Sequence, residues 1–444
     1  MNVEWPTKSC SFLRLAIDGL SNVTRLLPDV SKRFIERFTR VMTSSTVALS
    51  SRGVPVDTIE RRLAFISVDW SRAIAIPQFG DDESYILSTQ LDMSAAVSVK
   101  IVANSTTGVV RALATLLQMV ADRRKCLPVG IFIQDKPKFK WRGLMVDTAR
   151  RFQSIPALKR VCDGLEFARM NVLHLHLTDD QGWRFESRLW PRLTKVGNYD
   201  GKFYTQTQLS ELVRYCAIRG VRVVPEINTP GHCAAALFAY PSLAPDHFPS
   251  TFVTTWGVHN FVLDPSSTSI VTQFVNDILR EVSLVFSDAF IHVGGDEVVW
   301  PTPTNRQKAW MVSNNLTSVS MLHGFFQKNI TFPALARVGR RAMGWNEMYE
   351  AAGSRVANLP SGMAMQWWWS WALAPSPSPL VSVMSTGFYL NKLPRAKDLY
   401  AAAFLMPYDD GAEACLLERA RGRKSRSTRF SKLVGFCRGP VARS

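Results

Sequence analysis

Two adjacent carboxylic acids, Asp296 and Glu297, are the residues of this chain best placed for acid–base chemistry. They follow Gly294 and Gly295 at the end of FIHV, a short apolar segment that reads as a buried strand. Neighbours in an extended segment point in different directions. One carboxylate can therefore orient a group while the other, in an apolar pocket, keeps a raised pKa and acts as an acid. The same four residues are also ordinary turn composition, so the rest of the chain has to decide between a catalytic pair and a surface turn.

From Arg142 onward, short apolar segments alternate with helical patterns, which is typical of a parallel α/β fold. Seven segments are expected to be strands, and an eighth is expected around residues 413–416. The seven are GLMVDTA, NVLHLHL, VRVVPEI, FIHV, ARVGRRAMGW, MAMQWW and PLVSVMS. Eight such units in roughly 250–280 residues match the size of a (β/α)8 barrel.

Polar and aromatic side chains fall at or just after the ends of these strands. They are Asp147, Asp179, Asp180, His232, Asp296, Glu297, Trp345, Glu347, Gln366 and Trp367. The strand ends of a barrel converge on one face, where barrel enzymes place their chemistry. A doubly wound open sheet also gathers ligands at strand ends, but the chain has no GxGxxG or GxxxxGK[ST] phosphate loop. The sequence therefore favours a TIM barrel, over residues 139–417.

The two flanking regions differ from the barrel in texture. Residues 1–138 are expected to form a small α+β domain, with a helix over 34–42, strands over 85–91 and 97–103, and a helix opening after Gly108. Residues 418–444 carry nine Lys/Arg against one acid, which is +8 of the net charge of +17. Such a basic run is typical of a solvated, disordered end, and we expect no specific nucleic-acid partner.

Seven cysteines show neither CxxC nor zinc-finger spacing. Cys162 and Cys216 lie in helical patterns and are expected to be small, buried, apolar groups. His174 and His176 alternate along one expected strand without a third ligand at suitable spacing, which favours a packed histidine pair over a metal site. The sequence therefore predicts no metal.

Signals for a membrane or for secretion are sparse. No apolar run approaches the roughly 20 residues that span a bilayer. The first residues, MNVEWPTKSC, lack the pattern of a signal peptide. Four Asn-x-Ser/Thr sequons, at Asn22, Asn104, Asn315 and Asn329, are compatible with a glycoprotein on a secretory route.

Five motifs in order resemble glycoside hydrolase family 20, the β-N-acetylhexosaminidases: WRGLMVDTARRF, MNVLHLHLTDDQGWRFES, GVRVVPEINTPGH, HVGGDEV and FYLNK. The likeness runs from about residue 60 to about residue 415 and includes the small domain before the family's barrel. It implies an exo-acting hydrolase that removes terminal β-linked N-acetylglucosamine or N-acetylgalactosamine. In this family the substrate's own acetamido oxygen is the nucleophile. The implied partner is a carbohydrate, and no cofactor is implied.

The resemblance also implies a role for each matched residue. Glu297 would be the general acid that later activates water, and Asp296 would accept the acetamide N–H. Tyr389 would donate its hydroxyl to the acetamide oxygen, and Arg142 would bind vicinal sugar hydroxyls. The other matches would wall the pocket or support the acid: Trp345, Trp367, Phe388 in place of a usual tryptophan, Asp179, His232 and Asn391.

The resemblance breaks near the end of the barrel region. Leu417 stands where the family has a tryptophan, and Arg419 stands where it has a sugar-binding glutamate. The residues beyond lack apolar helical periodicity, so the barrel is expected to be incomplete at its eighth unit. An alternative function follows, a catalytically impaired member that still binds N-acetylhexosamines. A lysosomal or secreted location and a homodimer are expected from the resemblance alone.

Overall fold

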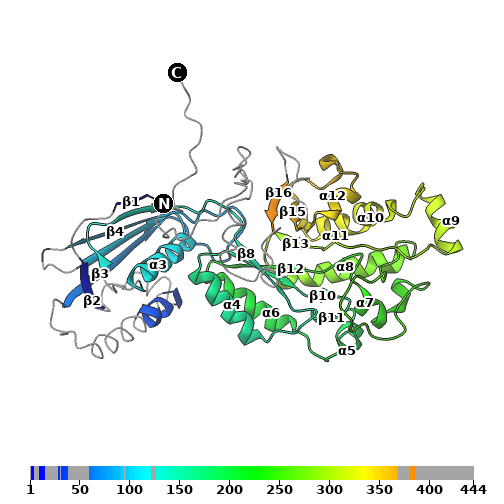
Figure 1. The fold of residues 1–444 in the computed structure, drawn as a ribbon, viewed down its shortest axis with the longest axis horizontal. Helices are drawn as coiled ribbons and strands as arrows, with labels where there is room; N and C mark the ends of the chain where they lie inside the picture. Colours follow the sequence, from blue (N-terminus) through cyan, green and yellow to red (C-terminus); the bar gives the residue numbers. More distant parts are fainter. Residues whose placement is uncertain are drawn as a thin grey trace, which may run out of the picture.

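The computed structural model of the chain describes residues 2–4, 10–15, 29–30, 32–38, 60–91, 93, 97–121, 127–368 and 380–385. Two parts lie side by side along the long axis of the molecule (Figure 1). One is a mixed sheet with helices on one face, and the other is a parallel sheet with helices around it. No helix in these ranges combines the length and the apolar character that crossing a membrane requires.

The N-terminal part is a seven-stranded sheet in the order β1-β7-β4-β5-β3-β2-β6. In that order its strands are β1 (Asn2–Glu4), β7 (Phe132–Asp135), β4 (Tyr85–Leu91), β5 (Val97–Ala103), β3 (Glu60–Trp70), β2 (Cys10–Leu15) and β6 (Leu127–Pro128). Helix α3 (Thr106–Ala121) buries Val109, Leu113 and Leu116 against it. The strands predicted over 85–91 and 97–103 are confirmed. The helix begins before Gly108 because the Ser105 hydroxyl accepts the Gly108 N–H at 3.1 Å and caps the first turn.

The second part is a parallel sheet whose seven strands lie in sequence order, from β8 at one edge to β16 at the other. They are β8 (Gly143–Asp147), β9 (Val172–His176), β12 (Arg222–Glu226), β13 (Phe290–His292), β14 (Arg341–Trp345), β15 (Ala364–Trp367) and β16 (Val381–Met384). Each falls in a segment predicted to be a strand. This is a (β/α)8-type barrel without its eighth unit among the described residues, since residues 413–416 lie outside them.

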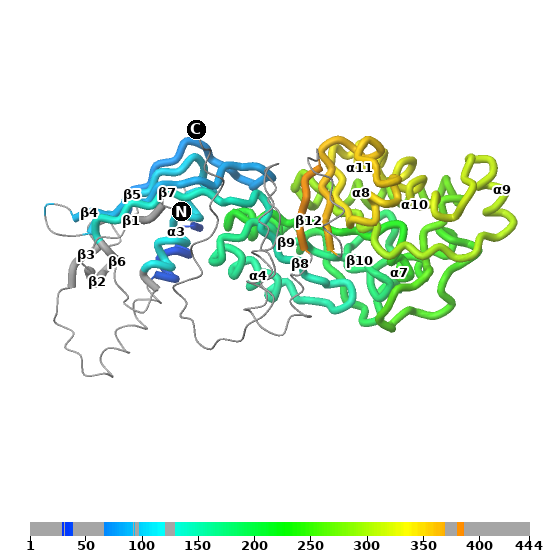
Figure 2. Tube along the Cα trace, turned by 45° about the horizontal axis from the view of Figure 1, so that its top comes forward, coloured from blue at the N-terminus to red at the C-terminus, as the bar shows by residue number. Residues whose placement is uncertain are grey.

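Helices connect the strands and cover the outer face of this sheet (Figures 1 and 2). The longest are α4 (Ile155–Phe167), α6 (Gln206–Ala217) and α8 (Thr268–Val285); the shorter helices are α5 (Arg192–Val196), α7 (Ala234–Ala239), α9 (Asn305–Ser313), α10 (Met321–Phe326), α11 (Phe332–Arg337) and α12 (Glu347–Ala351). Local sequence sets their first turns. Thr205 and Gln208 form a reciprocal capping box at the start of α6.

Side-chain alternation divides the barrel part into two layers. Leu173, Leu175 and Val223 point to the helices and join the large core there. Val172, Val224 and the neighbouring positions on the other strands form a separate inner cluster. Successive strand residues face opposite sides of a sheet, so parity along each strand decides which residues line the barrel interior.

A disulfide joins Cys162 of α4 to Cys216 of α6, with 5.8 Å between the Cα atoms. Both side chains are fully buried, as predicted, but their spacing in the sequence did not indicate the bond between them. The two cysteines are 54 positions apart in the sequence, and they meet because α4 packs beside α6.

Glu83 ties the two parts together at the N-terminal ends of the barrel strands. It accepts hydrogen bonds from Arg111 and Arg142 at 2.6 Å each and from Asn171 at 2.9 Å. Arg111 also donates to the carbonyl of Gly220 at 2.6 Å. Burial opposes ionisation of Glu83, yet the guanidinium groups of Arg111 and Arg142 prevail and lower its pKa.

Replacing Glu83 by glutamine should lower the free energy of unfolding by about 3 kcal/mol, because it leaves the buried Arg111 guanidinium without its counter-charge. Since the folded pKa is lowered, the carboxylate stabilises the fold above about pH 4.3, the pKa of an unfolded glutamate. That contribution is lost as pH falls through the lower folded value. Chemical denaturation at several pH values checks this, with exposed Glu211→Gln as control. Equal losses in both variants would contradict it.

Reducing the Cys162–Cys216 disulfide should destabilise the protein, because the bond closes a loop of 54 residues. The chain-entropy estimate for such a loop is about 4 kcal/mol, an upper figure. Denaturation with and without a thiol reductant measures it. The double variant Cys162→Ala/Cys216→Ala should be insensitive to the reductant.

Candidate functional site

The segments that follow β9, β12 and β13 meet at the edge of the barrel formed by the C-terminal ends of its strands. In chain order they carry Asp179, His232 and the Asp296–Glu297 pair. Asp179 is the last residue of β10 (Thr178–Asp179), which pairs with β11 (Gly182–Trp183) in a two-stranded sheet. The three strands are parallel neighbours, so the residues after their C-terminal ends lie together. His232 bridges the other two segments: Nδ1 lies 3.2 Å from Asp179 Oδ1, and Nε2 lies 3.4 Å from Glu297 Oε2.

The turn between β13 and the acidic pair requires glycine. Gly294 and Gly295 have φ values of 69° and 86°, in the left-handed region. A Cβ at Gly294 would collide with the Asn228 side chain, and a Cβ at Gly295 would collide with Met348. Glu297 itself has φ 49°, a conformation that is uncommon for a non-glycine residue and is concentrated at functional sites. The turn predicted from the two glycines is thus confirmed.

Asn228 holds both this turn and one carboxylate. Its amide N–H donates to Asp296 Oδ1 at 2.8 Å, and its amide oxygen accepts the Gly295 N–H at 3.1 Å. Sequence analysis assigned Asn228 no role. Its position directly after a strand end was the signal that could have found it.

His232 is a buried cation among carboxylates. Burial alone would lower the pKa of His232, but hydrogen bonds to Asp179, Asp180 and Glu297 outweigh burial and hold it well above the ordinary value. Burial would likewise raise the pKa of Asp179, but bonds from His176 and His232 keep it well below its usual range. Asp179 is therefore a fixed anion and His232 a fixed cation beside the pair.

The pKa values of the two acids differ in the opposite direction to the one expected from the sequence, because His232 lies against Glu297. Burial raises the pKa of Asp296, with His232 opposing that shift only in part. The hydrogen bond from His232 lowers the pKa of Glu297, which is also the more exposed carboxylate, at 35% against 18% for Asp296. The expectation that the acid would sit in an apolar pocket with a raised pKa thus fails for Glu297, because a charged imidazole lies against it.

Arg150, not Arg142, brings a guanidinium to this edge. Arg142 precedes β8, and its side chain bonds Glu83 and the carbonyl of Arg169 at the opposite end of the strand. Arg150 follows β8 and contacts Asp179 Oδ2 at 2.7 Å and Asp147 Oδ2 at 2.9 Å. The predicted arginine therefore lies at the wrong end of the strand to reach the pair, and the sequence analysis missed the arginine eight residues later.

Trp345 and Trp367 end neighbouring strands on opposite faces. Trp345 lies on the inner face, where its indole N–H donates to Glu226 Oε1 at 2.8 Å. Trp367 is only 1% exposed and packs in the helix-facing core with Met365 and Tyr349. The structure does not bring Trp367 to the acidic edge, because one position along a strand reverses the side on which a side chain lies.

The next residue, Trp368, reaches Glu347 at the start of α12. Its indole N–H donates to both carboxylate oxygens, at 3.0 Å and 2.9 Å. Burial raises the pKa of Glu347 to about 7, with the charges of Asp296 and Glu350 adding to the shift and the Trp368 bond opposing it. The Glu347 carboxyl, with a pKa of about 7, is thus close enough to Asp296 to be affected by its charge.

Three predicted site residues, Phe388, Tyr389 and Asn391, lie outside the described residues, as do Leu417 and Arg419. His174 and His176, predicted as a packed pair, both contact Glu226 within the barrel. Among the described residues the gathered set is therefore Asp147, Arg150, Asp179, Asp180, Asn228, His232, Asp296, Glu297 and, through Glu226, Trp345.

Comparisons with known proteins place this site in context. Residues 139–417 match the profile described as glycosyl hydrolase family 20, catalytic domain, and residues 22–119 match one described as beta-acetyl hexosaminidase like. A beta-hexosaminidase of Porphyromonas gingivalis is 35% identical over 61% of this chain and 36% of its own length. The chain spans about a third to a half of the length of the curated relatives it matches first.

Solved structures agree with this match. A chitobiase from Flavobacterium johnsoniae superposes with a TM-score of 0.65 at 27% identity, covering 87% of this chain and 58% of that one. An exo β-N-acetylglucosaminidase from Vibrio harveyi, solved in complex with N-acetylglucosamine, superposes with a TM-score of 0.64 at 25% identity, covering 86% of this chain and 59% of that one.

Two substitutions should move the pKa of Glu347 in opposite directions. Trp368→Phe removes the donor that favours the ionised form, so the pKa should rise above about 7. Glu350→Gln removes a neighbouring negative charge, so the pKa should fall. Carboxyl ¹³C chemical shifts followed through a pH titration measure both. Shifts of the same sign would contradict the geometry described.

Proposed function

The chain belongs to glycosyl hydrolase family 20, and from that premise we propose that it is an exo-acting β-N-acetylhexosaminidase. Its substrate would be a glycoconjugate or chito-oligosaccharide with a terminal β-linked N-acetylglucosamine or N-acetylgalactosamine. The observation that carries the proposal is the pair Asp296–Glu297, held at the barrel edge with His232 against both carboxylates. A single acid with a second, orienting carboxylate is what a substrate-assisted mechanism requires of the protein.

In the first step Glu297 gives its proton to the glycosidic oxygen while the bond from that oxygen to the anomeric carbon breaks. The acetamido carbonyl oxygen of the same sugar forms a bond to the anomeric carbon and yields an oxazolinium-like intermediate. Water then attacks that carbon, Glu297 takes the water proton, and the acetamide is restored. The anomeric configuration is retained, because each of the two displacements inverts it once.

Electrostatics support the assignment of Glu297 in spite of its lowered pKa. The carboxyl is partly open to solvent in the free protein, and His232 stabilises its ionised form. A sugar seated against it would expel water and strengthen the burial that raises its pKa. The His232 cation would then lie beside the carboxylate that forms when the proton leaves, and lower the cost of that charge.

Asp296 would accept the acetamide N–H and stabilise the positive charge that develops on the ring. Asn228 supports this role, since its amide N–H fixes one carboxylate oxygen and leaves the other for the substrate. The Asp296 charge is costly where burial raises its pKa, and a cationic intermediate would relieve that cost.

The remaining contacts to the sugar are proposed from position. Arg150 presents a partly exposed guanidinium beside the carboxylates, and would take the hydroxyl-binding role that resemblance gave to Arg142. Trp345 would form one wall of the acetamide pocket, and Trp368 rather than Trp367 would form another. Phe388, Tyr389 and Asn391 keep their proposed places by resemblance alone.

A secreted or lysosomal location is part of the proposal. A buried disulfide is typical of an oxidising compartment, and the sequon asparagines Asn104, Asn315 and Asn329 are exposed. A homodimer is proposed from the resemblance only. Nothing in the comparisons favours the catalytically impaired alternative.

Replacing Glu297 by glutamine should lower kcat on an aryl β-N-acetylglucosaminide at least about 100-fold, because no group remains to donate or accept the proton. Chromophore release from the full chain measures the rate. The variant should still bind a thiazoline-type inhibitor, since the pocket is unchanged. Undiminished turnover in Glu297→Gln, or no turnover in the parent protein, would overturn the proposed function.

A further inference from the structure

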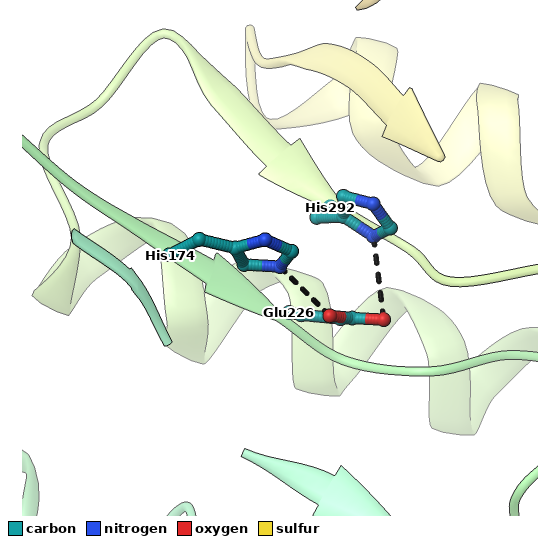
Figure 3. A group of neighbouring side chains, drawn as sticks. All are labelled: His174, Glu226 and His292. Carbon is teal, nitrogen blue, oxygen red and sulfur yellow. Dashed lines mark ion pairs between the residues drawn. The ribbon is translucent and has the colours of Figure 1, made fainter. Parts of the chain in front are cut away.

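A second acid, Glu226, lies within the barrel beneath the Asp296–Glu297 pair. It is the last residue of β12 and is fully buried. Figure 3 shows His174 of β9 and His292 of β13 directed at its carboxylate from the two neighbouring strands. The three residues share the inward parity of their strands, so the sheet register alone places them in one group.

Both carboxylate oxygens of Glu226 have polar neighbours at close distance. Oε2 lies 2.7 Å from His174 Nε2 and 2.9 Å from His176 Nδ1. Oε1 accepts the Trp345 indole N–H at 2.8 Å and lies 3.5 Å from His292 Nδ1. The rings pack on one another, with His292 and Trp345 edge to face at 4.8 Å. Glu226 therefore fixes the orientation of Trp345 through a hydrogen bond and through packing.

From Glu226 an alternation of imidazoles and carboxylates runs up to the catalytic edge. His176 turns its other nitrogen, Nε2, to Asp179 Oδ2 at 2.8 Å. Asp179 Oδ1 lies 3.2 Å from His232 Nδ1, and His232 Nε2 lies 3.4 Å from Glu297 Oε2. Each member contacts the next, so the orientation of one ring constrains the whole series.

Building on the proposed function, we propose that Glu226 is a positioning residue for the reaction. Through His176, Asp179 and His232 it holds the acid Glu297, and through Trp345 it holds the aromatic wall of the sugar pocket. It touches neither the sugar nor the reacting atoms. One buried carboxylate would thus set the geometry of both halves of the site.

The charges along the series are consistent with this role. Burial would raise the pKa of Glu226, but His176 and the other histidines hold it well below its ordinary value. Burial would lower the pKa of His176, but Glu226 and Asp179 hold it well above its ordinary value, with Asp147 adding to the shift. His176 is therefore a cation between two anions. Removal of Glu226 leaves that cation with one anion fewer.

The pKa of His292 is shifted in the opposite direction to that of His176. Burial lowers the pKa of His292 to about 3. Its Nδ1 accepts the Gly294 N–H at 3.0 Å, at the turn that leads to Asp296. His174, Glu226 and His292 have ligand atoms close enough to hold a cation. A cation bound through His292 Nδ1 and Glu226 Oε1 would have to displace the hydrogen bonds that these two atoms accept from Gly294 and Trp345.

The test is Glu226→Gln in the full chain, with Glu281→Gln as the matched control. Glu281 is also buried and hydrogen-bonded, by Ser187 and Arg188, but it lies outside this series. In Glu226→Gln we expect kcat on the aryl glycoside to fall at least about tenfold. The pKa of His176 should also fall, because one of the two anions beside the ring is lost, so kcat/KM should decline with rising pH at a lower pH than in the parent protein. Glu281→Gln should show no such shift.

Two further measurements extend the test, and the first of them does not depend on turnover. Histidine ¹⁵N shifts, assigned with His176→Asn, should show that His176 loses its proton at a lower pH in Glu226→Gln than in the parent protein. Trp345→Phe, which removes one bond to Glu226 and no charge, should raise KM while the pH profile stays unchanged. It also serves where Glu226→Gln does not fold.

An unaltered pH profile in Glu226→Gln would overturn the proposal, and so would an unaltered titration of His176. A stoichiometric metal in the purified parent protein, measured by elemental analysis, would also overturn it. A parent protein with no turnover would instead count against the proposed function. In that case the histidine titration alone would decide the role of Glu226.

Discussion

The charged imidazole of His232 is the contact on which the site depends. It lies between Asp179 and Asp180 on one side and Asp296 and Glu297 on the other. A buried cation is costly unless it is paired, so these groups hold one another in place. The same cation stabilises two adjacent acids that are only partly exposed to solvent.

The barrel scaffold makes this contact possible through parallel register. β9, β12 and β13 are neighbours, so the segments after them reach the same edge without long loops. The glycine turn after β13 then brings both acids back over His232, at the expense of a left-handed Glu297. Asn228 holds this turn through its hydrogen bonds to Asp296 and Gly295.

The division of labour between the two acids follows from these surroundings. Burial makes the charge of Asp296 costly, whereas Glu297 is open to solvent and paired with a cation. The free protein is therefore not set in the protonation state that acid catalysis requires. In the proposed reaction the substrate completes the site by excluding water from Glu297, which makes the acid depend on occupancy of the pocket.

Residue patterns along the chain were enough to predict the order of the barrel strands and the place of the acidic pair after one of them. Apolar segments of strand length, strand-end acids and the Gly294-Gly295 turn are local properties, and seven strands were found where those properties predicted them. The family match is likewise carried by contiguous motifs.

Where similar residues lie relative to the acidic pair could be seen only in the folded chain. Arg142 and Arg150 lie at opposite ends of one strand, and Trp367 and Trp368 differ by the single step that reverses a side chain. The Cys162–Cys216 bond and the contacts of Glu226 join residues that are far apart in the chain. Strand direction, parity and packing fix these choices, because each depends on where a neighbouring element lies, which no local pattern of residues records.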